Sequence, residues 1–198
     1  MTKGLETRDR ILDTAFRLAA RDGLEGLSLS ALAGELGLSK SGLFAHFRSK
    51  EDLQMQMLQV ASDRFVETVM VPAFKERRGL PRLDALFDRW VRWASNPELP
   101  GGCIFVAAAS ELDDQEGRVR EFVVAQQRRL LEAIARAATI AIQAGHFRRD
   151  LDVEQFAFEV LGTYLAFHHA RRLLRDPRAE KRARRAWAHV VESARSTN

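Results

Sequence analysis

The sequence predicts an all-α protein of about nine helices, with a three-helix domain at the N-terminus and a larger helical domain after it. Apolar residues recur at helical spacing along most of the chain, and no segment shows the strict alternation of a β-strand. Its 198 residues are 46% hydrophobic and 29% charged, a balance typical of a globular protein with a buried core.

The most informative stretch is residues 28–49. Apolar residues stand at the i, i+3, i+4 and i+7 positions of a short helix at 29–36. Gly37 follows where a left-handed residue would end that helix, and Ser39 is a good N-cap for a second one. Leu43 and Phe47 of the second helix should face inward, because they lie four residues apart.

Two short helices around a glycine turn predict a helix-turn-helix motif. The segment from Leu36 to Lys50 contains no Asp or Glu but carries Lys40, Arg48 and Lys50, as a phosphate-facing surface requires. On the pattern alone, two ordinary helices of an all-α core are the alternative.

Three segments, at 7–12 (TRDRIL), 26–29 (GLSL) and 38–50 (LSKSGLFAHFRSK), together resemble the DNA-binding domain of the TetR/AcrR family. The resemblance covers residues 7–53 in register, and beyond residue 55 it is one of length and helix pattern. It implies a cytoplasmic, homodimeric transcriptional repressor without enzymatic activity, cofactor or metal, which binds double-stranded DNA at a near-palindromic operator. It also implies a DNA-binding domain at 1–50 and an effector-binding and dimerisation domain at 51–198.

In that family the recognition helix corresponds to Lys40–His46, and the stretch ending in Lys50 touches the DNA backbone. The family usually has Tyr where this chain has Phe44, so one phosphate hydrogen bond is expected to be lost. Gly42 stands where a side chain often reads a base. The candidate DNA-binding residues are Thr7, Ser28, Ser30, Ser39, Lys40, Ser41, Gly42, Phe44, Ala45, His46 and Lys50.

The helices before and after the motif should frame it. The first is expected at 7–21, with Thr7 as its N-cap and an inward face of Ile11, Leu12, Ala15, Phe16 and Ala19. The fourth is expected to start after Ser49 and to run to about Val71, because Pro72 should stop it.

Five further helices are expected at 81–94, 103–112, 118–144, 153–175 and 179–194. The clearest loop in the chain is at 96–102, where Pro and Gly are frequent. The inward face of the helix at 81–94 should comprise Leu83, Leu86, Phe87, Trp90, Val91 and Ala94.

The resemblance implies that the last two helices form a four-helix dimer interface with a second copy, which suits the small-residue stripe of the final helix. The candidate interface residues are Leu161, Leu165, Ala179, Ala183, Ala186, Trp187, Val190, Val191 and Ala194.

The resemblance also implies that the middle helices enclose a small-molecule cavity, and an apolar lining favours a hydrophobic or aromatic effector. The candidate lining is Phe65, Phe87, Trp90, Cys103, Phe105, Phe122, Tyr164 and His168. Tyr164 and His168 share a helix face and are alternatively a hydrogen-bonded core pair. Cys103 is either a packed hydrophobe or a redox sensor.

Charge is unevenly distributed around the net value of +4. Residues 170–198 hold 9 Lys+Arg against 3 Asp+Glu, which favours a solvated face over a second nucleic-acid surface. Glu111, Asp113, Asp114 and Glu116 lack the spacing of a calcium loop and favour a solvated turn.

Other classes of protein find little support. No segment reaches the roughly 18 apolar residues of a membrane helix, and the N-terminus lacks a signal-peptide core. A single cysteine excludes an internal disulfide framework. The alternatives to a repressor are an all-α enzyme or protein-interaction module with an incidental helix-turn-helix, or an activator of the same family.

Overall fold

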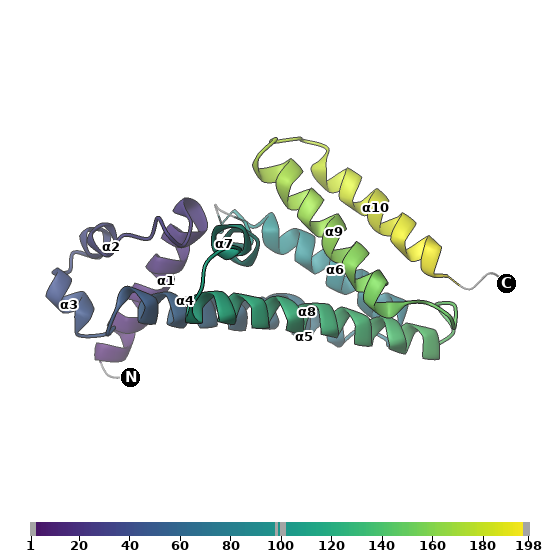
Figure 1. The fold of residues 1–198 in the computed structure, drawn as a ribbon, viewed down its shortest axis with the longest axis horizontal. Coiled ribbons are helices and arrows are strands. Elements are labelled where there is room, and N and C mark those ends of the chain that lie inside the picture. Colours follow the sequence, from purple (N-terminus) through teal and green to yellow (C-terminus); the bar gives the residue numbers. More distant parts are fainter. Residues whose placement is uncertain (1–2, 98, 100–101, 196–198) are drawn as a thin grey trace. The chain divides into compact units, whose positions relative to one another are not determined.

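The computed structural model describes residues 3–97, 99 and 102–195, which form helices joined by short connections and, within those ranges, no β-strand (Figure 1). The all-α prediction is therefore confirmed. In chain order the elements are α1 (Lys3–Asp22), α2 (Leu29–Leu36), α3 (Lys40–Phe44), α4 (Lys50–Phe65), the π-helical η1 (Val66–Met70), α5 (Val71–Phe74), α6 (Leu80–Ala94), α7 (Ile104–Leu112), α8 (Arg118–Gln143), α9 (Val153–Arg172) and α10 (Ala179–Ala194).

The chain forms two compact units. The first contains Met1–Arg64 and Asn96–Ala125, and the second contains Phe65–Ser95 and Gln126–Asn198. The boundary falls at the end of α4 and within α8. Position 50, where the sequence places the end of the DNA-binding domain, is the first residue of α4 and lies inside the first unit.

The core of the first unit is built on α1. The five side chains expected to face inward from this helix are all buried, with Ile11 and Ala15 fully so. The expected start at Thr7 is wrong, because α1 begins at Lys3. No proline interrupts residues 3–6, and Glu6 lies in the first turn, where a carboxylate favours the helix dipole. Thr7 is therefore a residue of the helix and not its cap.

The helical run that begins with α4 does not end at Pro72, and this expectation is also wrong. The α-helix gives way at Val66 to the π-helical η1, and α5 then carries the chain through Pro72 to Phe74. At the end of η1 the N–H of Val71 bonds to the carbonyl of Val66, five residues back. Pro72 thus falls in the first turn of α5, a position that tolerates its missing N–H.

The second unit packs α6 beneath α9 and α10. All six residues predicted to face inward from α6 are buried. Trp187 of α10 stacks on Phe87 at 4.7 Å between ring centroids, and its indole N–H donates to Asp84 at 2.8 Å. The Arg184 guanidinium meets Asp88 at 2.8 Å, and this hydrogen bond raises the pKa of Arg184. Residues of α10 are thus joined to α6 of the same chain.

This docking corrects part of the expected dimer interface. Five residues of the predicted α10 stripe are buried within their own chain, namely Ala179, Ala183, Trp187, Val191 and Ala194. They cannot at the same time form the contact surface for a second copy. Of the other predicted interface residues, Leu165 is exposed and Leu161, Ala186 and Val190 are half-buried.

Two of the connections can be compared with the sequence prediction. Of the loop expected at 96–102, positions 98, 100 and 101 lie outside the described residues. Helix α9 ends at Arg172, earlier than expected, and Arg175 adopts a left-handed φ of 50° before Pro177. Across the described ranges, no helix has both the length and the apolar character required to cross a lipid bilayer.

Candidate nucleic-acid interface

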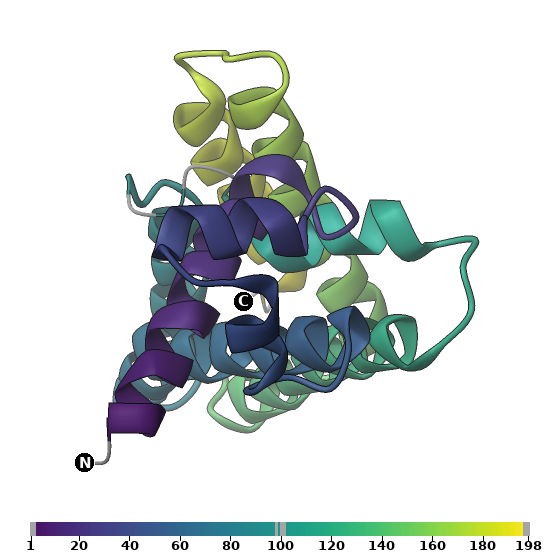
Figure 2. The same cartoon turned by 90° about the vertical axis from the view of Figure 1, so that its left-hand side faces the viewer.

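The turn between α2 and α3 has the geometry that its glycine predicts. Ser28 caps α2 by accepting a hydrogen bond from the N–H of Ala31, and Gly37 adopts a φ of 66° at the other end. The N–H of Leu38 returns to the carbonyl of Ala33 at 2.9 Å, as in a Schellman motif. Figure 2 shows the two short helices joined by this turn beside α1. The local helix-turn-helix geometry thus matches the prediction.

Helix α3 presents a face of small side chains and one large aromatic ring. Its N-cap Ser39 accepts from the N–H of Gly42 at 3.0 Å, while Leu43 and Phe47 are buried at 1% and 2% exposure. Phe44 is 48% exposed, although a phenyl ring gains free energy by burial. The other residues left open are Lys40, Ser41 and Ala45, and His46 is half-buried.

A surface groove of about 470 Å³ lies beside α3 within the first unit. It is lined by Glu25, Leu27, Ser28, Leu29, Ser30, Lys40, Phe44 and Lys50. The groove brings together five of the predicted DNA-binding residues from the start of α2, from α3 and from the start of α4. Thr7, on α1, is not among the lining residues, and neither are Ser39, Ser41, Gly42, Ala45 and His46.

The ammonium group of Lys50 is held in place within this groove. It donates to the backbone carbonyl of Glu25 at 2.9 Å, and Gln54 donates to the carbonyl of Leu24 at 3.0 Å. Residues 23–27, which connect α1 to α2, are thereby tied to α4. A positioned cation at the edge of a groove can receive a phosphate without losing much conformational entropy.

The same connection is held from its other side by α7 and the turn that follows it, and the sequence did not predict this contact. The Glu111 carboxylate accepts from the N–H of Glu25 at 2.9 Å, and Gln115 donates to the Glu25 carboxylate at 2.6 Å. A Cβ at Gly23 would come within 2.7 Å of the Glu111 carboxylate, so any larger residue there would displace that side chain from its present position. The φ of 87° at Gly23 lies in the left-handed region, which favours glycine. No local pattern marks this pairing, because its partners are 86 and 90 residues apart.

The link between α3 and α4 is fixed by a second polar cluster. The Asp52 carboxylate accepts from the N–H of Arg48 at 2.9 Å and from the Gln56 amide at 2.8 Å. The hydrogen bond from Gln56, followed by that from Arg48, lowers the pKa of Asp52. Arg8 of α1 bonds to Gln56 and lies over the Phe47 ring at 5.9 Å. These contacts set the direction in which α4 leaves the motif.

The candidate effector residues are divided between the two units. In the second unit, Phe65 meets Trp90 edge-on at 6.4 Å, and Trp90 stacks on Tyr164 at 3.7 Å. Phe87 belongs instead to the cluster around Trp187. His168 lies one turn after Tyr164 on α9 and is half-buried. The remaining three lie in the first unit: Cys103 and Phe105 are buried and Phe122 is half-buried.

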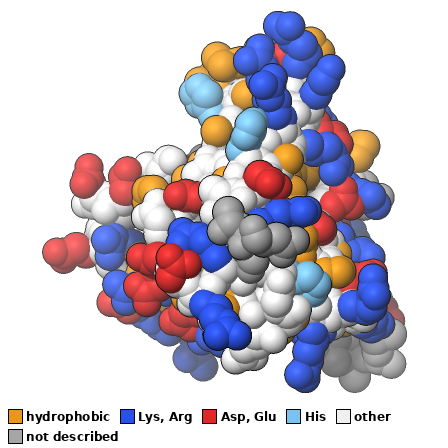
Figure 3. All heavy atoms as spheres, turned by 90° about the vertical axis from the view of Figure 1, so that its right-hand side faces the viewer, with side chains coloured by type: hydrophobic (Ala, Val, Ile, Leu, Met, Phe, Trp, Pro, Cys, Tyr) orange, Lys and Arg blue, Asp and Glu red, His pale blue; other side chains and the backbone are white. Residues whose placement is uncertain are grey.

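The basic end of the chain is open to solvent. The side chains of Arg171, Arg172 and Arg175 are exposed, and Leu173 and Leu174 between them are 71% and 63% exposed. Figure 3 shows Lys and Arg side chains gathered at the top of this face, over the turn between α9 and α10. In the acidic turn after α7, Asp113, Asp114 and Glu116 are also exposed.

Two family models match the chain. Residues 11–55 match the model described as bacterial regulatory proteins, tetR family, and residues 79–187 match that of the tetracyclin repressor-like C-terminal domain. An HTH-type transcriptional regulator of Staphylococcus aureus (strain USA300) is 36% identical over 61 residues, or 31% of this chain. The chain covers 33% of the length of that relative.

Solved structures resemble the chain along nearly its whole length. A TetR transcriptional regulator from Chloroflexus aurantiacus has a TM-score of 0.86 and 28% identity, covering 97% of this chain and 96% of its own. AibR, solved in complex with isovaleryl coenzyme A and operator DNA, has a TM-score of 0.73 at 24% identity, covering 93% and 96%, and supports the fold alone. The C-terminal family model matches more than half of the residues, and its N-terminal counterpart coincides with the helix-turn-helix. The chain belongs to the TetR family of DNA-binding transcriptional regulators.

Proposed function

We propose that this regulator is a repressor, in which a homodimer binds a near-palindromic operator and leaves it when a small hydrophobic or aromatic effector binds. The observation that carries the proposal is the groove beside α3. It combines Lys40 and Lys50 with the first turn of α2 and the exposed ring of Phe44. The cations can contact the phosphates of the DNA backbone, and the exposed face of the helix can lie beside the base edges.

The residues of this surface divide into two roles. Lys40, His46 and Lys50 bind phosphates, with Ser28 and Ser30 at the N-terminal end of α2, where the helix dipole favours an anion. Thr7 and Ser39 are also proposed to contact the DNA backbone. Ser41, Gly42 and Ala45 lie nearest the base edges. The Phe44 ring cannot donate to a phosphate and instead contacts an apolar group such as a thymine methyl.

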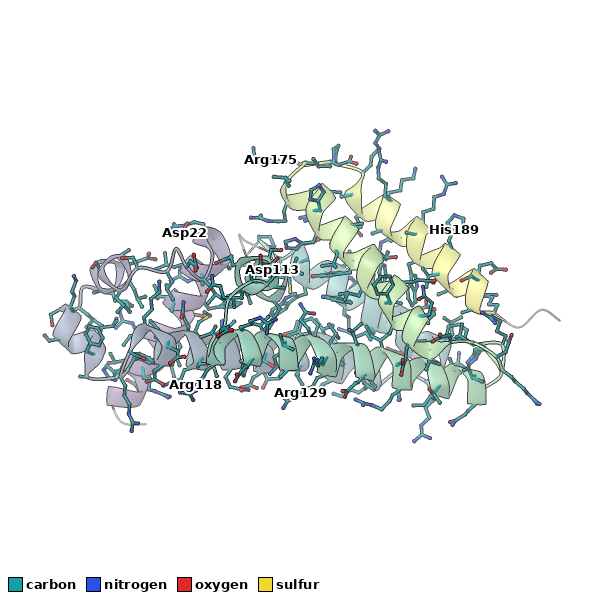
Figure 4. All side chains as sticks on the ribbon, viewed as in Figure 1. Asp22, Asp113, Arg118, Arg129, Arg175 and His189 are labelled. Atoms are coloured by element: carbon teal, nitrogen blue, oxygen red, sulfur yellow. The ribbon has the colours of Figure 1, made fainter. Side chains whose placement is uncertain are left out.

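The dimer is proposed to form through the exposed side of α9. Phe158 is 67% exposed and Leu165 is 40% exposed, with Gly162 on the same face between them. An apolar row of this kind calls for a partner. A symmetric contact would add Leu161 with Ala186 and Val190 of α10. His189, which Figure 4 shows pointing away from α10, would flank it.

Effector binding is proposed to act through the helical run that starts at Lys50. The run comprises α4, η1 and α5, from Lys50 to Phe74. It carries Lys50 in the first unit and Phe65 in the second. An effector bound beside Phe65 and Trp90 favours a different tilt of this run, which changes the separation of the two recognition helices. Coupling of this type is typically about 1–3 kcal/mol, and operator DNA must weaken effector binding by the same factor.

The proposal assigns the chain to the cytoplasm and gives it no enzymatic role. Its test begins with selection of bound sequences from a random duplex pool. Near-palindromic sites are expected, with half-sites about one helical turn apart. In vitro transcription from a promoter that carries the selected site should then fall as protein is added. A rise in the amount of transcript would identify an activator. If the selection enriched no common sequence, that result would contradict operator binding.

A further inference from the structure

The chain contains three tryptophans, and they differ in how their indole N–H groups are satisfied. Trp187 donates to the Asp84 carboxylate at 2.8 Å. Trp90 and Trp93 are 2% and 6% exposed, and neither indole nitrogen has an acceptor among the described residues. An indole nitrogen can only donate, so these two groups are buried donors that lack a partner.

Both donors belong to one aromatic cluster in the second unit. Trp90 and Trp93 lie one turn apart on α6, and both meet Phe65 edge-on, at 6.4 and 5.7 Å between ring centroids. Tyr164 of α9 stacks on Trp90 at 3.7 Å and contacts Phe167 at 6.0 Å. The cluster thus combines a large apolar surface with two polar hydrogens.

Buried donors without acceptors are rare in proteins, because their desolvation is not compensated. Two of them in adjacent turns of one helix indicate that the acceptor comes from outside the chain. The aromatic rings around them favour a flat apolar body over a water molecule, which would require two or more polar partners. This pattern of many apolar contacts with a few polar groups is typical of a small-molecule site.

The charge of the ligand follows from the same cluster. The arginines that lie over aromatic rings elsewhere in the chain, Arg8, Arg64 and Arg82, lie over Phe47, Phe16 and Phe74, which are not part of this cluster. The nearby guanidinium of Arg92 lies 72% exposed, paired with Asp88 at 2.6 Å. A buried carboxylate needs a cation beside it, whereas a carbonyl oxygen needs only donors.

We infer that Trp90 and Trp93 form the polar contact of a site for an uncharged, planar, largely apolar molecule that carries a carbonyl-type acceptor. This inference rests on the proposed function, since it assigns the chemical class of the effector. The two indole N–H groups donate to the two lone pairs of the carbonyl oxygen of the ligand, and Phe65 and Tyr164 contact its apolar body.

The experiment uses the whole protein with labelled indole N–H groups, observed in a two-dimensional proton–nitrogen correlation spectrum. The probes are indanone, its hydrocarbon counterpart indane, and indane carboxylate. The variants Trp90→Phe and Trp93→Phe each remove one resonance and so assign the spectrum. Trp187 serves as an internal control, because its indole N–H already has an acceptor.

Indanone should move the resonances of Trp90 and Trp93 downfield and leave that of Trp187 in place. It should bind about tenfold more tightly than indane, and the variant with both tryptophans replaced should lose that preference. Equal affinities for indanone and indane, tighter binding of the carboxylate, or equal movement of all three resonances would overturn the assignment.

Operator affinity measured with the same probes separates this inference from the proposed function. If the two indole resonances respond to indanone and operator affinity does not change, the site stands and the proposed induction fails. If indanone releases the operator while the two resonances stay in place, induction stands and the site is wrongly assigned.

Discussion

The Glu111 carboxylate accepts a hydrogen bond from the backbone N–H of Glu25 at 2.9 Å, and through it α7 holds the connection between α1 and α2. The backbone carbonyl of Glu25 in turn accepts a hydrogen bond from the ammonium group of Lys50. Glu25 therefore joins an element outside the helix-turn-helix to one of the cations that we propose to bind DNA.

Replacing Glu111 with Ala should release this connection. The expected loss is about 0.5–1.5 kcal/mol of unfolding free energy, because this hydrogen bond is exposed and water can replace the lost acceptor. Operator affinity should fall as well, since Lys50 is then less well positioned. Thermal unfolding and fluorescence anisotropy measure the two effects. Asp114→Ala, which removes an exposed charge from the same region, is the matched control and should change neither quantity.

Replacing Lys50 with Ala should weaken binding to all DNA sequences about equally. Loss of one phosphate contact should lower the slope of log affinity against log salt concentration by about one unit. Titrations of selected and unselected duplexes at several salt concentrations measure this slope. Lys75→Ala, at an exposed lysine of the second unit, is the control. An unchanged slope in the Lys50 variant would contradict the proposed phosphate contact.

Replacing Phe158 with Glu should dissociate the proposed dimer without unfolding the chain. The ring is 67% exposed, so the folded monomer loses little, whereas a symmetric interface would bury two carboxylates near its centre. Sedimentation at micromolar concentration distinguishes the two states. Thr139→Glu on the exposed side of α8 should leave the dimer intact. Dimers that persist in the Phe158 variant would show that α9 does not form the interface in this way.

The stability of the α3–α4 link should depend on pH through Asp52. Its pKa is lowered in the folded protein by hydrogen bonds from Gln56 and from the Arg48 N–H. The stabilisation is therefore present above the unfolded pKa of about 3.9 and is lost as the pH falls through the lower folded value. Asp52→Asn should cost about 1 kcal/mol at neutral pH and much less near pH 3. Unfolding curves across this range test it, with Glu67→Gln as the control, and a pH-independent difference would contradict it.

The sequence was sufficient where neighbouring residues determine the structure. The left-handed turn at Gly37 and the burial of Leu43 and Phe47 follow from residue type and spacing. The π-turn before Pro72 was not predicted, because spacing patterns assume a regular helix of 3.6 residues per turn. The stripe that includes Trp187 was recognised, but a stripe does not show whether its partner is α6 of the same chain or a second copy. The contact between Glu111 and Glu25 depends on the tertiary fold and has no local pattern.

The central claim is that two copies of the chain place their α3 helices together in successive major grooves of one operator. The measurement is the affinity of the dimer for the selected operator and for two versions with base pairs inserted between the half-sites. An insertion of about five base pairs turns one half-site to the opposite face of the duplex, and about ten restore the face but extend the spacing. The account predicts a large loss of affinity for both insertions. Equal affinity for all three duplexes would contradict it.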